Sequence, residues 1–431
     1  MKALIAAMIL AAGTPWSLTD CINYALDHNI RVKQSKISVE QKEIALNTAR
    51  NSFLPGVSAG ASQNFSFGRG LTADNTYANT NTTSTSFSLG GEMPVFQGLQ
   101  LVNNVRLSKL DLEASTRDLD KTKDDIRVAV AKAYMTILYN GEILSVAKSQ
   151  QEVDSMLVER IREVKTSGKA SEADVAAQEA TYAQSCLNTV QAQNNLHISV
   201  LDLSQLLELE SPDSLSIVTP DVEGMEITVL KNPEQIYAAA LEVKPAIKAE
   251  EARVAYAERY IAVARGAFSP TLSLSGGIGT NYYTTSGLPS PSFGEQLKNN
   301  FSQYVGLSLN IPIFSRMSNA NNLKVAKLNY SNQQLQLENV KKELYKEIQQ
   351  AYYNAVASQS KFISSGKAAE SSYKSFELTK EKYAAGKANI TEYNQAKDKN
   401  LEAASNFIQA RYECLFQTRL LDFYEGKEII L

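Results

Sequence analysis

Two long stretches of the chain, residues 95–211 and 313–431, carry apolar residues at spacings of three, four and seven and contain no proline. This is the pattern of α-helices that pack against one another as a coiled coil. The recurring apolar positions are Ile126, Val130, Ala133, Ile137, Leu144 and Ala147 in the first stretch and Leu337, Val340, Leu344, Ile348, Ala351 and Ala355 in the second. A turn marked by a glycine interrupts each stretch once, at Gly168 and at Gly386. Each stretch therefore predicts a long helix that folds back on a return helix as a coiled-coil-like hairpin.

Residues 57–94 are almost free of charge and alternate polar with apolar side chains, most clearly at 62–67 and 84–89. A period of two is that of a β-strand. We expect two strands of about nine to eleven residues, joined by a long polar loop at residues 68–83. The alternation alone fits both a soluble hairpin with one solvated face and a pair of strands in a membrane barrel. The N-terminal segment and the repeat described next favour the barrel.

The same order of elements is predicted twice along the chain. A first helix at residues 18–50 is stopped by Pro55, and a second short helix at residues 233–265 is broken at Pro245. A second strand pair is expected at residues 271–283 and 302–310, with a loop rich in Gly, Ser and Pro between them. Short motifs recur in step, since Phe53-Leu-Pro55 returns as Phe268-Ser-Pro270 and Met93-Pro-Val-Phe96 returns as Ile311-Pro-Ile-Phe314. We divide the chain into a first structural repeat (16–211), a linker or equatorial segment (212–232) and a second repeat (233–431).

Residues 1–15 predict a secretory signal peptide. The basic residue Lys2 precedes a compact apolar run at residues 3–12, which ends in small residues suited to cleavage. The run is too short to span a bilayer as a helix, and no other segment has about eighteen uninterrupted apolar residues. We therefore expect the mature chain to leave the cytoplasm without a transmembrane helix.

The net charge of the 431-residue chain is −3, which argues against a nucleic-acid partner held by phosphate neutralisation. Cys21, Cys186 and Cys414 lack metal-ligand spacing, and their odd number is no disulfide framework, so we interpret them as buried thiols. His28 and His197 have no nearby catalytic constellation, and the sequence holds neither a phosphate-binding loop nor an HExxH motif. We expect no catalytic, metal or cofactor site, and hence no enzyme.

The lengths of the predicted elements point to an oligomer. A helix from Gly98 to about Lys165 has roughly 70 residues and would run on the order of 100 Å. Such a rod with strands at one end has no closed core of its own, and four strands cannot close a barrel with a lumen. Several copies around one axis would solve both problems, which makes a ring-shaped homo-oligomer the simplest solution.

The chain resembles the TolC-like outer-membrane efflux protein family from about Trp16 to about Gly426. The matching features are Leu18-Thr-Asp-Cys-Ile-Asn-Tyr-Ala-Leu-Asp-His-Asn29, Phe53-Leu-Pro55, Pro94-Val-Phe96, Pro312-Ile-Phe314 and the turn glycines Gly168 and Gly386. The resemblance implies a mainly α-helical protein with membrane β-strands that assembles as a homotrimer. Each protomer would give four strands to a twelve-stranded β-barrel in the outer membrane of a Gram-negative bacterium, and four helical strands to a periplasmic tunnel. The implied partners are outer-membrane lipid, a periplasmic adaptor (membrane fusion) protein and an inner-membrane pump of the RND type or the ABC type.

The resemblance also suggests roles for residues at the two turns. Glu392 matches the first of two acidic residues that face the lumen near the periplasmic entrance, whereas Gln395 is neutral at the second position. Tyr383 matches a tyrosine that links helices in the closed state, and Asp174 matches an acidic partner at the first turn. The expected adaptor contacts are Lys165, Gly168, Lys169, Ala170, Gly386 and Lys387. A solvated helix charge is an equally good interpretation of Glu392, and helix C-caps account for both glycines.

These observations favour the outer-membrane exit duct of a tripartite efflux or type I secretion system. The alternative is a secreted structural coiled-coil protein, such as a filament or adhesin subunit. Aromatic residues near the predicted strands favour the channel because such residues form girdles at membrane interfaces. They are Phe65, Phe67, Phe87, Tyr282, Tyr283, Phe301 and Tyr304. Whether the substrate is a drug, a metal ion or a polypeptide stays open.

Overall fold

The computed structural model describes residues 15–430 except 72–74, 213–214 and 221–228. Residues 1–14, which hold nearly all of the predicted signal peptide, lie outside the described residues. The elements of the first half are α2 (Leu18–His28), α3 (Ile30–Asn51), β1 (Gly56–Leu71), β2 (Tyr77–Gln97), α4 (Gln100–Thr166) and α5 (Glu172–Leu206). Those of the second half are α6 (Pro233–Val243), α7 (Pro245–Gly266), β3 (Thr271–Thr285), α8 (Phe293–Asn299), β4 (Ser302–Asn310), α9 (Ser318–Ala384) and α10 (Ile390–Tyr424). Apart from α8, the second half repeats the element order of the first.

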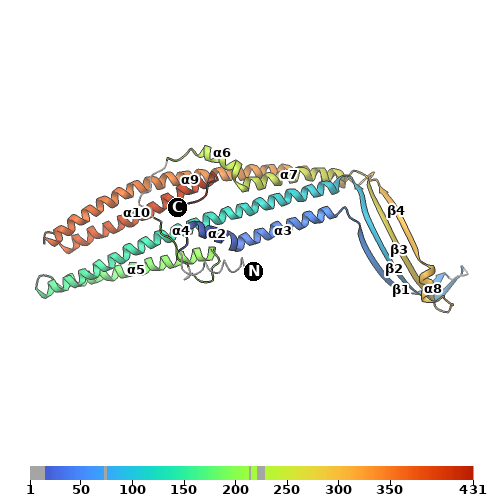
Figure 1. Cartoon of the computed structure of the whole chain (residues 1–431), viewed down its shortest axis with the longest axis horizontal. Coiled ribbons are helices and arrows are strands. Elements are labelled where there is room, and N and C mark those ends of the chain that lie inside the picture. The colour runs from blue at the N-terminus through green and yellow to red at the C-terminus, as the bar shows by residue number, and fades with distance from the viewer. Residues whose placement is uncertain (1–14, 72–74, 213–214, 221–228, 431) are drawn as a thin grey trace. The chain divides into compact units, whose positions relative to one another are not determined.

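The chain forms two compact units, each built from both halves of the sequence. The first, the hairpin unit, comprises residues 1–38, 116–248 and 338–431, and the second, the sheet unit, comprises residues 39–115 and 249–337. The 67-residue helices α4 and α9 contribute residues 116–166 and 338–384 to the hairpin unit, where they fold back at tight turns onto the 35-residue helices α5 and α10 (Figure 1). The predicted hairpins are therefore confirmed.

The core of the hairpin unit gathers around the predicted seam of α4. Ile126, Val130 and Ile137 are at most 5% exposed and pack with Cys21 of α2 and Leu203 of α5. The hydroxyl of Tyr134, in the same cluster, donates a hydrogen bond of 2.6 Å to the carbonyl of Val218. This bond holds the chain at Val218, next to the parallel β-bridge that Ile217 forms with Trp16.

The predicted helix at residues 18–50 is wrong in one respect, because it is broken at Asn29 into α2 and α3. Asn29 leaves the helical conformation with a ψ of 132° and is only 4% exposed. Its side-chain amide donates to the carbonyl of Leu206, and its side-chain oxygen accepts from the N–H of Arg31. The first bond pairs a carbonyl at the end of α5, and the second pairs an N–H at the start of α3; both groups would otherwise be left without a helical partner.

The sheet unit contains one antiparallel sheet with the order β1-β2-β3-β4. The predicted strand lengths and the predicted loop at residues 68–83 are wrong, since β1 has 16 residues and β2 has 21. Asn and Thr residues of the supposed loop pair across the hairpin, with Phe67 opposite Asn81 and Arg69 opposite Asn79. The predicted second strand pair is confirmed, but the loop between its strands contains α8, which sequence reasoning missed.

Helix α8 covers the edge of β3 where β4 has ended. β4 pairs with β3 only as far as Gly279, whereas β3 continues to Thr285. Beyond that point, the side chain of Gln296 in α8 accepts from the N–H of Tyr283 and donates to its carbonyl, both at 2.9 Å. The amide thus makes the two backbone hydrogen bonds that a neighbouring strand would make.

Candidate functional site

Both hairpin turns close with the same hydrogen-bond pattern. Gly168 has a φ of 75°, its N–H donates to the carbonyl of Lys165 at 2.9 Å, and the N–H of Lys169 donates to the carbonyl of Val164 at 3.1 Å. Gly386 has a φ of 70°, and the N–H groups of Gly386 and Lys387 make the corresponding bonds at 3.1 and 2.8 Å. This pattern is the Schellman motif, which favours glycine because the residue is left-handed. The prediction that both glycines are helix C-caps is confirmed.

Asp174 and Glu392 occupy equivalent positions, each in the first turn of a return helix. Ser171 caps α5, and its N–H and hydroxyl both donate to Oδ2 of Asp174, at 2.8 and 2.7 Å. These two bonds stabilise the carboxylate and hold the pKa of Asp174 below its ordinary value. At the second turn, Asn389 accepts from the N–H of Glu392 at 2.8 Å, and its amide lies 3.4 Å from Oε1 of Glu392. Of the four residues of the predicted gate, Asp174 and Glu392 thus cap the starts of their own helices.

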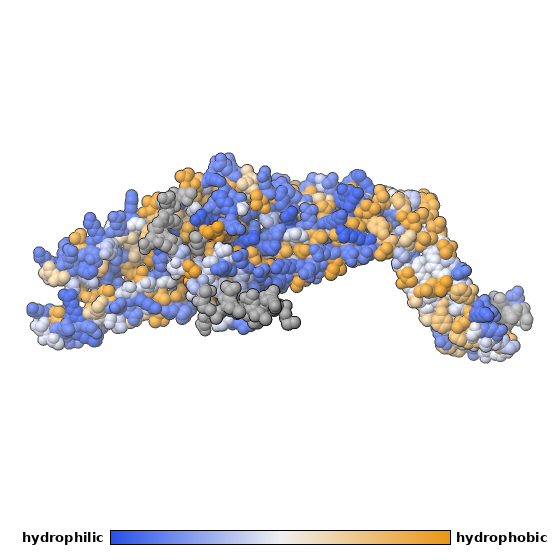
Figure 2. Space-filling view, in the orientation of Figure 1, coloured by the Kyte–Doolittle hydropathy of each residue, from blue (hydrophilic) through white to orange (hydrophobic). Residues whose placement is uncertain are grey.

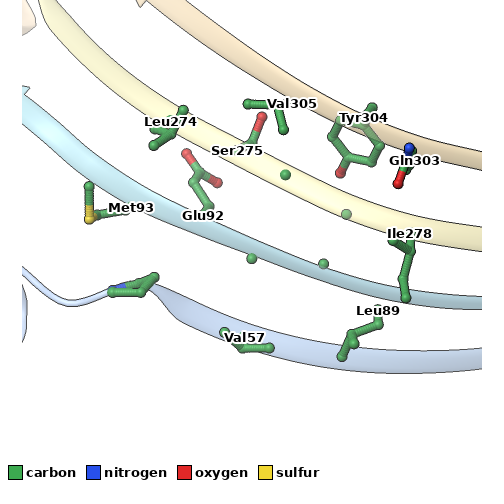
Figure 3. Close-up of a pocket in the computed structure, with 15 residues that line it drawn as sticks. Val57, Leu89, Glu92, Met93, Leu274, Ser275, Ile278, Gln303, Tyr304 and Val305 are labelled. Atoms are coloured by element: carbon green, nitrogen blue, oxygen red, sulfur yellow. The ribbon is translucent and has the colours of Figure 1, made fainter.

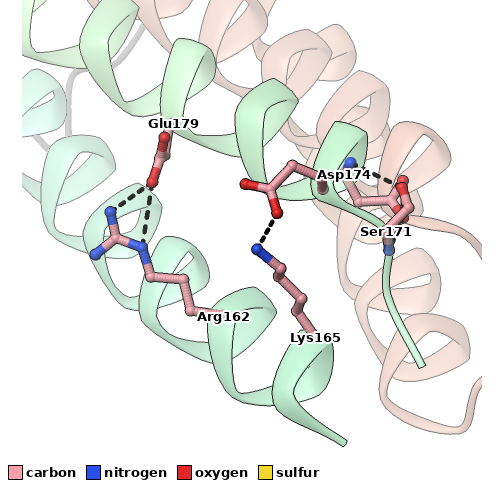
Figure 4. A network of polar contacts seen from close by, with 6 residues as sticks. Arg162, Lys165, Ser171, Asp174 and Glu179 are labelled. Carbon is pink, nitrogen blue, oxygen red and sulfur yellow. Dashed lines mark hydrogen bonds and ion pairs between the residues drawn. The ribbon is translucent and has the colours of Figure 1, made fainter. Parts of the chain in front are cut away.

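Ion pairs join α4 to α5 just above the first turn (Figure 4). Lys165 pairs with Glu172, and both the Nε and an Nη of Arg162 donate to Oε1 of Glu179, at 3.2 and 2.5 Å. The second turn differs, because no ion pair between α9 and α10 occurs among the described residues closer to it than Lys361–Glu413. The two turns have the same backbone conformation but carry different patterns of charged side chains.

The other residues predicted at the turns are mostly exposed. Gln395, Lys165, Lys169 and Lys387 are exposed, as is Glu392, while Ala170 is half-buried. Tyr383 is half-buried, with its ring 5.1 Å from that of Tyr393 in α10 and 5.6 Å from the guanidinium of Arg160 in α4. Tyr383 therefore contacts both hairpins, whereas the described residues include no hydrogen bond or ion pair from Glu392 or Asp174 to the opposite turn.

Sequence reasoning missed a polar seam between the two hairpins, made of Asp154, Gln178, Asn394 and Lys397. Lys397 of α10 pairs with Asp154 of α4, and the two side chains are 3% and 2% exposed. Beside them, the amide of Asn394 donates to the side-chain oxygen of Gln178 at 3.0 Å. Asp154 follows Ala147 by seven residues and so continues the apolar seam. A charge at such a position is a sign of a buried partner on a facing helix.

The strands of the sheet present two different faces. Because strand residues alternate, residues paired across the sheet share a face. The apolar face carries Val57, Phe65, Phe67, Phe87, Leu89, Met93, Leu272, Leu274, Ile278, Val305, Leu307 and Leu309. The polar face carries Ser58, Ser62, Asn64, Ser66, Ser84, Ser86, Ser88, Glu92, Ser273, Ser275, Asn281, Ser302 and Ser308, together with Tyr283 and Tyr304. Most of these apolar side chains are open to solvent, with Val305 83% and Leu307 71% exposed, whereas Met93, Leu272 and Leu274 are half-buried.

Hydrophobic residues gather over the strands in the space-filling view, in contrast to the mostly hydrophilic helices (Figure 2). A hollow of about 850 Å³ lies in this region, where Gly91 of β2 pairs with Gly276 of β3. It is lined by Val57, Leu89, Ile278 and other apolar residues together with Glu92, Ser275, Gln303 and Tyr304 (Figure 3). It holds no grouping of side chains suited to catalysis.

Among the described residues, no helix combines the length and apolar character needed to cross a bilayer. Nor does that part of the chain bring together three side chains able to hold a metal ion. Two of the three predicted buried thiols are confirmed, since Cys21 and Cys414 are at most 1% exposed, whereas Cys186 is only half-buried. Burial raises the pKa of Cys21 to about 12.

The sequence profile of the family described as "Outer membrane efflux protein" matches residues 21–208 and 236–424, which together span most of the chain. The chain belongs to this family. It is 25% identical to the outer membrane protein TolC of Escherichia coli K12 over 381 residues, which cover 86% of this chain and 74% of TolC. The efflux protein is accordingly located in the outer membrane of a Gram-negative bacterium and extends into the periplasm.

Solved structures share the fold. A membrane protein from Pseudomonas aeruginosa matches with a TM-score of 0.79 at 19% identity, covering 95% of this chain and 92% of that protein. The CmeC outer membrane channel of Campylobacter jejuni matches with a TM-score of 0.76 at 21% identity, covering 95% and 86%. These likenesses concern the fold, which is mostly helical with a four-stranded antiparallel sheet.

Proposed function

We propose that the protein is the exit duct of a tripartite efflux or type I secretion system. Three protomers would form one twelve-stranded barrel in the outer membrane and an α-helical tunnel in the periplasm. Substrates delivered by an inner-membrane pump of the RND or ABC type would pass through it to the exterior. Residues 16–211 and 233–431 would be the two structural repeats of each protomer, joined by the linker 212–232.

The observation that carries this proposal is the two-faced sheet. An apolar face open to solvent is costly in water, at roughly 25 cal/mol per Å² of apolar surface, but is favourable against lipid tails. The opposite face, rich in serine and glycine, suits a water-filled lumen. In the described sheet, β1 and β4 each have one edge without a strand partner, and neighbouring copies would pair these edges to close the barrel.

Exposed apolar stripes on the helices support a homotrimer. Ile30, Ile37 and Ile44 recur every seven residues on α3 and are 53%, 52% and 67% exposed. Leu187, Val190, Ile198 and Leu201 of α5 are 49–66% exposed. Stripes of this kind are the seams of coiled coils and would be covered by helices of neighbouring protomers.

The hairpin turns are the proposed periplasmic entrance. The adaptor would contact Lys165, Gly168, Lys169, Ala170, Gly386 and Lys387. Asp174, Tyr383, Glu392 and Gln395 would line or control the opening, and three Glu392 carboxylates near one axis would favour cations. Because Gln395 is neutral, α10 would contribute one acidic ring to this opening, that of Glu392.

Single-channel recording in planar bilayers tests the proposal. Wild-type protein should insert and give discrete, cation-selective steps, and Glu392→Ala should change their size or selectivity. Glu381→Ala removes an exposed charge five residues before Gly386 and serves as the control. Conductance steps that are the same in all three proteins would still support a channel but would leave Glu392 with a capping role alone. Folded, helical protein that never inserts would overturn the channel and favour a structural coiled-coil rod.

A further inference from the structure

The four strands contain only two charged residues, Arg69 in β1 and Glu92 in β2. The two lie on opposite faces of the sheet. Arg69 shares the face of Phe65 and Phe67, near the end of its strand, where its guanidinium lies 5.8 Å from the centre of the Tyr77 ring. Glu92 is the one charge on the polar face, whose other residues are neutral.

The register determines where Glu92 points. Glu92 pairs with Gly56 on one side and Ser275 on the other, so it shares their face, whereas Met93 pairs with Leu274 on the apolar face. Figure 3 shows the carboxylate of Glu92 beside Ser275 of β3. Gly56 contributes no side chain, and the structure gives Glu92 no hydrogen bond or ion pair within the described part of the chain. The side chain is exposed, and its charge is not neutralised by a neighbour.

We propose that Glu92 determines the charge preference of the channel within the outer membrane. The inference rests on the proposed function, in which the polar face lines the lumen of a trimeric barrel. Threefold symmetry then places three Glu92 carboxylates in one ring on an otherwise neutral wall. Such a ring attracts cations and repels anions, as acidic rings do in cation channels. The solutes that it favours are cations, whether inorganic ions or positively charged organic molecules.

The size of the effect depends on the width of the lumen and on the salt concentration. A twelve-stranded barrel lies between eight-stranded barrels, which are filled by side chains, and porins of sixteen or more strands, which hold an aqueous channel. The screening length is about 10 Å at 0.1 M salt and about 3 Å at 1 M. The carboxylates therefore act across much of such a lumen at about 0.1 M salt, and only close to the wall at about 1 M.

The test is the ratio of potassium to chloride permeability, taken from the reversal potential of single channels under a KCl gradient near 0.1 M. Glu92→Gln keeps the size of the side chain and should lower this ratio about two-fold or more, with little change near 1 M. Arg69→Gln, on the apolar face, is the matched control and should leave the ratio unchanged. The decrease should persist in a Glu392→Gln background, because the sheet and the turns act separately.

A second measurement restores the charge at the same position. In Glu92→Cys protein that also carries Cys186→Ser, the thiolate attacks an anionic methanethiosulfonate reagent, which forms a mixed disulfide and releases methanesulfinate. The anionic group attached in this way should restore the preference for cations, whereas a cationic methanethiosulfonate reagent should lower the ratio of potassium to chloride permeability further.

Wild-type and Glu92→Gln channels with equal permeability ratios near 0.1 M would overturn the inference while leaving the channel intact. So would a decrease that disappears in the Glu392→Gln background. Wild-type protein that gives no steps at all would instead refute the proposed function.

Discussion

Replacing Lys397 with methionine would leave the carboxylate of Asp154 buried between the hairpins without its cation. Asp154 as a whole residue is 1% exposed. Its other hydrogen-bond partner is the side-chain amide of Gln150, which donates to Oδ2 at 3.0 Å. Removing one partner of a buried ion pair costs roughly 3–5 kcal/mol, because the other charge keeps its desolvation penalty. We expect Lys397→Met to lower the free energy of unfolding by about that amount.

The double variant Asp154→Leu with Lys397→Met gives the opposite expectation. It removes both charges and both desolvation penalties, so its stability should lie within about 1 kcal/mol of wild type or exceed it. Circular dichroism at 222 nm during urea unfolding of the detergent-solubilised protein measures the midpoint and slope for each variant. The slopes should be equal, so that the midpoints report stability.

Lys361→Met is the matched control, because Lys361 pairs with Glu413 at 2.9 Å in a contact whose side chains are 47% and 43% exposed. An exposed pair contributes about 0–1 kcal/mol, so this variant should unfold close to wild type. A double variant as unstable as Lys397→Met would refute the reasoning, since the loss would then come from packing rather than from an unpaired charge. Equal losses for Lys361→Met and Lys397→Met would refute it as well.

Three further predictions concern local features. Gly386→Ala should destabilise the second turn by about 1 kcal/mol because alanine is strained at a φ of 70°. Limited proteolysis of the turn measures this loss of stability, and the control Gly141→Ala, in the middle of α4, should show none. In native protein a maleimide should label Cys186 well before the two buried cysteines, as mass spectrometry would show, and equal labelling would contradict the burial of Cys21 and Cys414. Because the pKa of Asp174 is lowered, the cap of α5 contributes stability above the ordinary carboxyl pKa of 3.8 and loses this contribution as pH falls through the lowered pKa. In Ser171→Ala the pKa of Asp174 should rise, and an NMR titration of the carboxyl carbon, assigned with Asp174→Asn, measures it.

Features that depend on local chemistry could be predicted from the sequence. The long helices follow from their spacing of apolar residues, and both turns follow from glycines that adopt a left-handed conformation. The break at Lys244 follows from Pro245, which cannot donate a helical hydrogen bond. In each case the cause lies within a few residues of the effect.

Features that depend on partners distant in the sequence could not be predicted from it. The break at Asn29 has no proline or glycine nearby, and its side chain bonds the carbonyl of Leu206, 177 residues away. The Asn- and Thr-rich part of β2 has the composition of a loop but is held as a strand by pairing with β1 along its length and with β3 from Thr82 onward. At the turns, the roles assigned to Glu392, Gln395 and Tyr383 depend on neighbouring protomers and stay predictions.

Gln296 has a consequence for the fidelity of assembly. By occupying the N–H and carbonyl of Tyr283, it removes the outer part of β3 as a template for another strand. In the proposed trimer, a neighbouring copy would therefore add a strand on this side of the sheet only along the nine residues of β4. A short docking edge with a fixed end leaves few alternative registers. In the proposed barrel, one glutamine in a seven-residue helix would thus oppose misaligned pairing between copies of the chain.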